Sequence, residues 1–311
     1  MAGWAGGERP KEPSQSIVRG VFQRRRVRPG CGDQRPVRVR LIVVCGTAET
    51  TPRTALPTDV SVQIDTTLSF CSDSNGGDPD SASPTLRAYH RMLWSKPLPN
   101  GRVLELTDTR KGSYLYHMSE LGEFFLGSDA ITHSYRNHRR KRWLTEQIPH
   151  QVNELFDAGS TIGAYIIFPN KRIGHGHTIN QARGVDSLID DRFDLTLECI
   201  RRFYLSQESP LYSTLWRYQR FFALFCDFEG YTRFFLLEDL VGLDGRVKFY
   251  LPFDDFRTRP AFSSVDEYLW YKNGVMEFVR SRNRRIEDYV RDAGHGSGRH
   301  MAAYSSARES C

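Results

Sequence analysis

The sequence lacks the short motifs by which nucleotide-binding and hydrolytic enzymes are most often recognised. It contains no GxGxxG fingerprint, Walker A loop, GxSxG nucleophile elbow or HExxH zinc motif, and it has no internal repeat. These absences remove the commonest chemistries that a motif can identify. An enzyme whose active residues are scattered along the chain stays open.

Cysteine pairs and long apolar runs are also missing. The six cysteines show no CxxC and no paired spacing, so the sequence predicts neither a disulfide framework nor a zinc site. No apolar run approaches the roughly 18–20 residues that a membrane-spanning helix requires. We therefore expect a soluble, cytoplasmic protein that has no membrane partner and no metal or other cofactor.

Positive charge is concentrated at the N-terminus. Residues 1–58 contain ten Arg and one Lys against four acidic residues, which leaves 32 of the 43 basic and 33 of the 37 acidic residues for the remainder. The body of the protein is therefore close to neutral, and we do not expect nucleic acid to be its partner. The basic leader, in contrast, could bind nucleic acid.

Residues 1–58 are rich in Arg and Pro and almost free of aromatic residues, a composition that predicts disorder. The segment could be an upstream extension from a misplaced start, an Arg-rich tail that binds an anionic partner, or an organelle transit peptide. Several prolines would interrupt the amphipathic helix of a transit peptide. Of the three interpretations we favour the upstream extension from a misplaced start. The low-complexity tail, 293–311, is also predicted to be disordered.

Between the tails, residues 60–292 have the pattern of a single α+β domain, with early and central strands followed by a mostly helical half. The β-branched, uncharged run 161–168 predicts a central strand. Ser264 and Glu267 form a capping box at the start of a final helix. The other expected strands are 60–70, 102–106 paired with 114–117, and 247–253, and the other expected helices are 85–94, 143–158, 187–204, 211–225 and 231–241.

The most strongly patterned helix is predicted over residues 187–204. Its apolar stripe is formed by Phe193, Leu197, Ile200 and Tyr204, at helical spacing. Ser187 would cap its N-terminus, and Gly184 would turn the preceding polar segment into it. A helix that is apolar over so wide an arc is expected to be central in the domain.

The same helix carries a polar sector about 120° wide. Its members are Asp190, Asp191, Asp194, Glu198, Arg201 and Arg202. In one interpretation the sector faces solvent and its charges form i,i+4 pairs. In the other it lines a cleft, where carboxylates and guanidinium groups could bind a cation, a phosphate or a proton in transfer.

Asn180 and Arg183 precede this helix and would lie beside its N-terminus, which favours anions. We expect Arg183 to meet Asp191, Asp194 or Glu198, in a contact that is partly buried, because an isolated charge beside an apolar helix is unfavourable. The candidate catalytic residues are therefore Asn180, Arg183, Asp191, Asp194, Glu198 and Arg202.

Three weaker patterns favour structural over functional interpretations. Asp73, Asp78 and Asp80 lack the spacing of a calcium loop. His175 and His177 could face one side of an extended segment as metal ligands, but no third ligand is identifiable, and a loop is the simpler interpretation. The basic run 133–142 could be either a solvated helix face or a phosphate-binding patch.

Several long segments of the chain resemble an uncharacterised family of bacterial and phage proteins, over about residues 60–292. The segments that carry the resemblance are GGDPDSASPTLRAYHRMLWSKPLPNG (76–101), FFLGSD (124–129), TINQARG (178–184), DRFDLTLECIRRFY (191–204), SPLY (209–212), DFEGYTRFFLLEDLV (227–241) and LPFDDF (251–256). The resemblance implies the extent of the domain, and it implies no activity, cofactor or catalytic residue.

Two hypotheses about function follow. The neutral body and the missing motifs favour a non-catalytic accessory protein of a bacterium or phage that acts through protein contacts. The alternative is an enzyme that acts on a phosphate-bearing or nucleotide substrate, using the polar cluster of the 187–204 helix.

Overall fold

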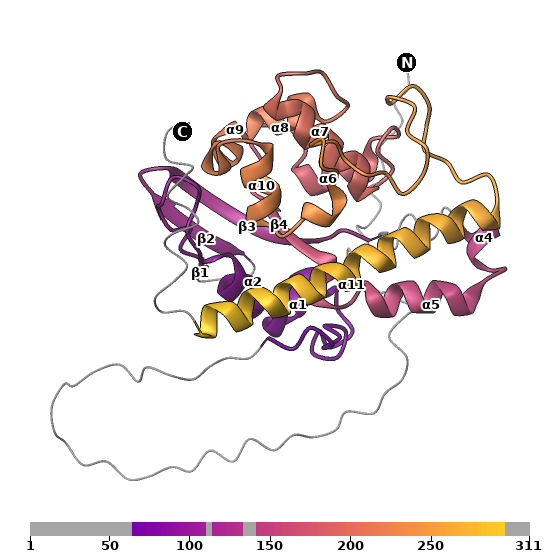
Figure 1. The fold of residues 1–311 in the computed structure, drawn as a ribbon, viewed down its shortest axis with the longest axis horizontal. Coiled ribbons are helices and arrows are strands. Elements are labelled where there is room, and N and C mark those ends of the chain that lie inside the picture. Colours follow the sequence, from indigo (N-terminus) through magenta and orange to yellow (C-terminus); the bar gives the residue numbers. More distant parts are fainter. Residues whose placement is uncertain (1–63, 110–113, 133–140, 296–311) are drawn as a thin grey trace, which may run out of the picture.

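The sheet and helices were located in a computed structural model, which describes residues 64–109, 114–132 and 141–295 of the chain (Figure 1). The predicted leader, most of the basic run 133–142 and the chain beyond residue 295 lie outside these ranges. A four-stranded antiparallel sheet comes early and helices dominate later, which confirms the α+β prediction. Within the described residues no helix is both long and apolar enough to cross a membrane.

The sheet has the strand order β1-β2-β3-β4, and each strand is antiparallel to its neighbour. Its register places Tyr116 opposite Phe125 and Asp129 opposite Ile166. The strands are β1 (Thr107–Asp108), β2 (Leu115–Ser119), β3 (Gly122–Ala130) and β4 (Tyr165–Pro169).

Two sequence predictions about the sheet need correction. The longest strand, β3, was not predicted, although it pairs with both β2 and β4. The run 161–168 forms a 3-10 turn, η1 (Ile162–Ala164), before β4, and β4 lies at an edge of the sheet, not at its centre. All five residues of β4 are nevertheless buried. The helices that cover β4 therefore explain its apolar sequence, although the strand is not central in the sheet.

Three other expected strands do not form within the described residues. Residues 64–70 are turns, Val103 makes only an isolated bridge to Pro97 around the 99–101 turn, and Val247 makes only a bridge to Val241. Beyond Val247 the chain is held by side chains: the rings of Phe249 and Phe253 stack 4.1 Å apart. The apolar residues of 247–253 thus serve ring packing, which produces the same alternation in sequence as a strand.

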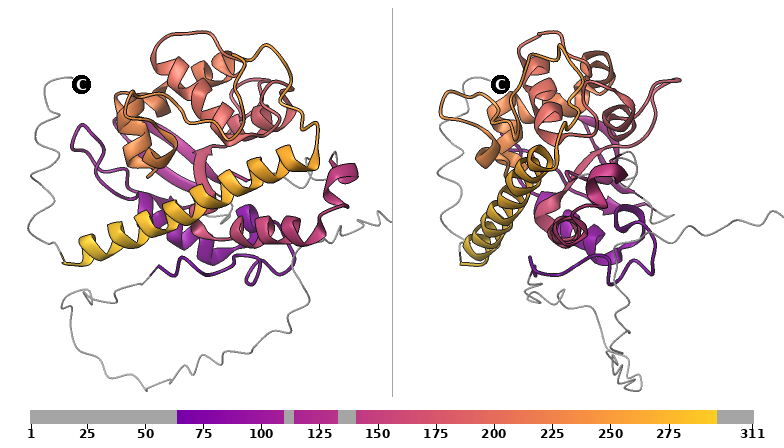
Figure 2. Two further views of the ribbon diagram at one scale, coloured as in Figure 1. Left: turned by 45° about the vertical axis from the view of Figure 1, so that its right-hand side comes forward. Right: turned by 90° about the vertical axis from the view of Figure 1, so that its right-hand side faces the viewer.

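The helical part is built around α11, which runs along the molecule with α5 beside it (Figures 1 and 2). The same views show α6–α10 gathered on one side of α11 and α5 on the other. The helices are α1 (Pro79–Ala82), α2 (Pro84–Trp94), α4 (Arg142–Thr145), α5 (Pro149–Ala158), α6 (Ile179–Val185), α7 (Phe193–Tyr204), α8 (Tyr212–Arg217), α9 (Gln219–Phe222), α10 (Phe228–Phe234) and α11 (Val265–His295), with 3-10 turns η2 (Ala223–Phe225) and η3 (Glu238–Leu240).

Helix α7 is shorter than predicted. Asp190 and Asp191 have φ of 46° and 64°, so the chain turns there and the helix starts at Phe193, not near Ser187. The preceding polar segment is itself a helix, α6, with a capping box between Thr178 and Gln181. Gly184 lies inside α6 and does not provide the turn. The turn is made by the two aspartates.

An aromatic cluster forms much of the core between α2 and α10. Phe225, Tyr231 and Phe235 pack with ring centroids 5.0–5.4 Å apart, and Trp94 of α2 meets Phe235 edge on at 5.2 Å. These rings are fully or almost fully buried, and large aromatic side chains contribute much of the buried area of a core. Cys199 is a buried free thiol.

Helix α11 is fixed to this core by a fully buried arginine, Arg282. Its guanidinium donates to the backbone carbonyls of Gly163, Tyr165 and Phe235 at 2.7–3.1 Å. Burial without a directly bonded carboxylate lowers the pKa of Arg282 to about 10. One side chain therefore joins α11, η1, β4 and the end of α10.

Arg282→Ala is expected to lower the free energy of unfolding by about 3–5 kcal/mol, because three buried carbonyls lose their donor. The measurement is urea unfolding followed by circular dichroism. Arg284→Ala, an exposed position on the same helix, is the control and should change stability by less than about 0.5 kcal/mol. Equal effects of the two changes would show that Arg282 does not hold α11 in place.

Candidate functional site

Arg183 is the centre of a buried ion cluster. Its guanidinium, which is 0% exposed, forms an ion pair with Asp129 of β3 and lies 3.6 Å from an Asp191 carboxylate oxygen. It also donates to Thr196 Oγ1 at 3.0 Å and to the Asp191 carbonyl at 3.2 Å. The predicted contact with Asp191 is therefore confirmed. The predicted partial burial is wrong, because the side chain is completely enclosed.

The local chain conformation places these groups together. Arg183 is in the last turn of α6, and the 190–191 turn brings Asp191 back against it, with the Asp191 N–H donating to the Arg183 carbonyl at 3.0 Å. Asp129 points to the same place from β3. Burial raises the pKa of Asp129 to about 7, although the neighbouring Arg183 opposes the shift.

Two further buried ion pairs extend this cluster. Lys141 Nζ lies 2.9 Å from Asp190 Oδ2, and Arg192 forms a two-point pair with the Asp194 carboxylate. The same carboxylate accepts the Tyr250 N–H at 3.1 Å. Asp190 and Asp194 therefore connect α7 to the segments at 141 and 250.

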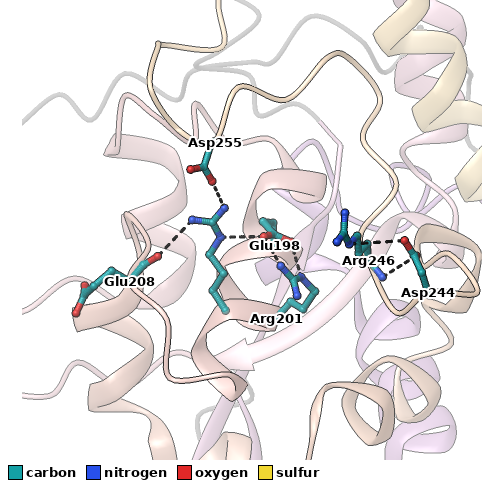
Figure 3. Close-up of polar contacts among 7 residues, drawn as sticks. Glu198, Arg201, Glu208, Asp244, Arg246 and Asp255 are labelled. Carbon is teal, nitrogen blue, oxygen red and sulfur yellow. Dashed lines mark hydrogen bonds and ion pairs between the residues drawn. The ribbon is translucent and has the colours of Figure 1, made fainter.

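The other end of the polar sector is less buried and is joined to a different segment (Figure 3). Glu198 accepts from Arg201 at 2.8 and 2.9 Å and from Arg202 at 2.8 Å. Arg202 also pairs with Asp255 and lies over the Phe256 ring at 5.0 Å. The segment around 255 is thus held against the last turns of α7.

The six candidate residues do not converge on one point. Arg183 and Asp191 belong to the buried cluster, Asp194 pairs with Arg192, and Glu198 and Arg202 form the outer group. Asn180 is half-buried in the first turn of α6, and across the described segments no hydrogen bond links its side chain to the other five. The polar sector therefore neither faces solvent nor lines one cleft, and its acidic groups are held in internal ion pairs.

A cleft of about 190 Å³ lies beside this sector and is lined by none of the six candidates. Ligand pockets for drug-sized molecules are typically 300–1,000 Å³, so the cleft is too small to enclose a nucleotide. Among the residues that the structure describes, no group of three His, Cys, Asp or Glu side chains could hold a metal. His175 and His177 are exposed. That they belong to a mobile loop stays a prediction.

Three residues that form the ion pairs of the site were missed in the sequence analysis. Asp129 lies 54 positions before Arg183, Lys141 lies 49 positions before Asp190, and Arg192 was not considered at all. Asp129 occurs in the FFLGSD segment, whose only available signal was an acid that ends an apolar run. Arg192 could have been found as the basic residue directly before the helix, within two residues of Asp194.

Arg183→Ala is expected to lower the free energy of unfolding by about 3–5 kcal/mol, because it leaves the Asp129 and Asp191 carboxylates buried without this cation. Chemical unfolding measures the change. Arg172→Ala is a matched control, since Arg172 is exposed and donates to Gln181 at 3.1 Å; its effect should stay below about 1 kcal/mol. A loss of less than about 1 kcal/mol for Arg183→Ala would contradict the structural role.

Asp129 should make stability depend on pH. Its pKa is raised to about 7 in the folded protein, above the unfolded value near 4. Its contribution is therefore complete below about pH 4 and is lost as pH rises through about 7. Urea unfolding of the wild type and Asp129→Asn from pH 5 to 8 should show a fall in the wild type that the variant lacks. Parallel curves would show that Asp129 does not titrate in this range.

Comparison with known proteins gives a family and no activity. No curated protein and no solved structure matches the chain. The model of a family of unknown function, DUF6994, matches residues 64–286, a range that contains the sheet, the buried cluster and most of α11. The chain belongs to this family of unknown function.

Proposed function

We propose that the protein is a non-catalytic accessory protein of a bacterium or phage that acts through contacts with other proteins. The observation that carries the proposal is a partly exposed aromatic surface formed by the end of α7 and by α8. We define this α7–α8 surface by four residues: Phe203, Leu205, Tyr212 and Trp216.

Three of the four side chains of the α7–α8 surface are aromatic rings that pack on one another. The rings of Tyr212 and Trp216 stack with centroids 6.3 Å apart, and Phe203 lies 6.1 Å and 6.5 Å from them. Trp216 and Leu205 are each 52% exposed. Aromatic residues are enriched in protein interfaces, where large rigid rings contribute contact area at a small loss of conformational entropy.

The enzyme alternative has less support from the geometry. An active site needs polar groups that converge where a substrate can reach them. Here the carboxylates of the candidate set, Asp191, Asp194 and Glu198, are paired with Arg side chains of the protein itself, and the nearby cleft is lined by none of them. The resemblance of the sequence to an uncharacterised family of bacterial and phage proteins supports the proposal that the protein comes from a bacterium or phage.

The proposal is tested by recovering bound proteins from cells of the source organism. The full chain and a Trp216→Ser, Leu205→Ser double variant are purified from such cells under identical conditions, and the bound proteins are quantified by mass spectrometry. We expect at least one partner to be lost about tenfold or more with the double variant, since exposed Trp residues often dominate binding energy.

Trp270→Ser provides the control, because Trp270 is 66% exposed but lies on α11. It should retain the partner that the double variant loses. Recovery of the same proteins by all three chains would contradict a contact through the α7–α8 surface. Circular dichroism melts must show that each variant is folded.

A further inference from the structure

The cleft beside α7 is formed by three segments that are distant in sequence. Leu188 in the turn before α7 and Leu195 in the first turn of α7 line it, the 251–261 segment forms another wall, and Glu267 lines it from the first turn of α11. The 251–261 wall is held in place by the bond from Tyr250 to Asp194 and by the ion pair of Asp255 with Arg202. Its shape is therefore fixed by the ion pairs of α7.

The apolar part of the lining suits a group about the size of one side chain. Its apolar residues include Leu188, Leu195, Leu251, Phe253, Phe256 and Pro260. An apolar cavity of about 150 Å³ is enough to hold benzene, and this cleft has a volume of about 190 Å³. The cleft can thus accept one ring or branched aliphatic group.

Two guanidinium groups also line the cleft. The Arg192 side chain is only 3% exposed, and its Nε and one terminal nitrogen are bonded to Asp194. Its other terminal nitrogen, Nη1, is not used in the pair with Asp194. Arg259 is 55% exposed and forms an ion pair with Asp190 at 3.8 Å. Both residues therefore have N–H groups beside the apolar part of the wall that these ion pairs do not use.

Acidic groups also face the cleft. Asp254 accepts from Thr258 Oγ1 at 2.5 Å and from the Arg257 N–H at 3.2 Å, and Glu267 accepts from the Ser263 N–H and hydroxyl at 2.6 Å each. These local bonds hold each carboxylate within its own segment. Their charge weakens the attraction for an anion, so we expect modest affinity, with a Kd on the order of 1 mM.

We propose that this cleft binds a small carboxylate or phosphate that carries an apolar group about the size of one side chain. The anion accepts hydrogen bonds from Arg192 and Arg259, which suit planar or multidentate oxyanions. The apolar group packs against the leucine and phenylalanine side chains. Such a ligand could be a free small molecule or the C-terminal residue of a peptide. The proposal is independent of the α7–α8 surface.

Binding is measured with the full chain at pH 7 by isothermal titration calorimetry and by ligand-observed NMR. The probes are benzoate, phenyl phosphate and N-acetyl-phenylalanine, with benzamide, N-acetyl-phenylalanine amide and acetate as controls. We expect each apolar anion to bind at least about tenfold more tightly than its neutral amide or acetate, because both features are required. If N-acetyl-phenylalanine binds more tightly than benzoate, the ligand is a peptide C-terminus. If benzoate binds more tightly, the ligand is a free small molecule.

The contribution of the cleft is tested with Arg259→Gln. Arg259 is half-exposed, so the variant should fold, and binding of the best probe should weaken by about fivefold or more. Arg257→Gln is the matched control: Arg257 is exposed two residues away and is not part of the lining. Absence of binding at 10-fold above the expected Kd, equal affinity for charged and neutral probes, or equal effects of the two substitutions would overturn the proposal.

Discussion

The Arg183 guanidinium is the constraint on which the arrangement of the domain depends. A charged group that is completely buried is tolerated only if other groups compensate it, and here the compensation comes from β3, the 190–191 turn and α7. The position of α6 against the sheet and the left-handed turn at Asp190 and Asp191 both follow from this requirement. Arg282 imposes a similar constraint on α11, with backbone carbonyls in place of carboxylates.

The ion pairs of α7 continue outward from this centre. Arg192 and Asp194 connect the start of the helix to the chain at Tyr250, and Arg202 connects its end to Asp255. The segment between these two attachments has no regular structure and still keeps a defined shape. The polar sector of α7 therefore acts as a scaffold that holds one wall of a cleft, and its carboxylates are paired with Arg and Lys side chains of the protein.

The sequence predicted the positions of helices correctly where the pattern lies within one short segment of the chain. Helical spacing and capping residues located α2, most of α7 and the start of α11. Prediction failed where a distant group decides the conformation. The start of α7 is displaced because Asp190 and Asp191 bond to Lys141 and Arg183. The 247–253 alternation serves aromatic packing and a bond to Asp194, not a sheet. For the site, the contact of Arg183 with Asp191 was predictable because the two are close in sequence, whereas Asp129 was not.

The central claim is that Arg183 and Asp129 are energetically coupled as a buried pair. A double-mutant cycle with Arg183→Gln and Asp129→Asn, measured by urea unfolding at pH 8, tests it most directly. The account predicts that the double variant is more stable than the sum of the two single changes would allow, by about 1.5–3 kcal/mol. Additivity within about 0.5 kcal/mol would mean that the two residues act independently, and it would contradict the account.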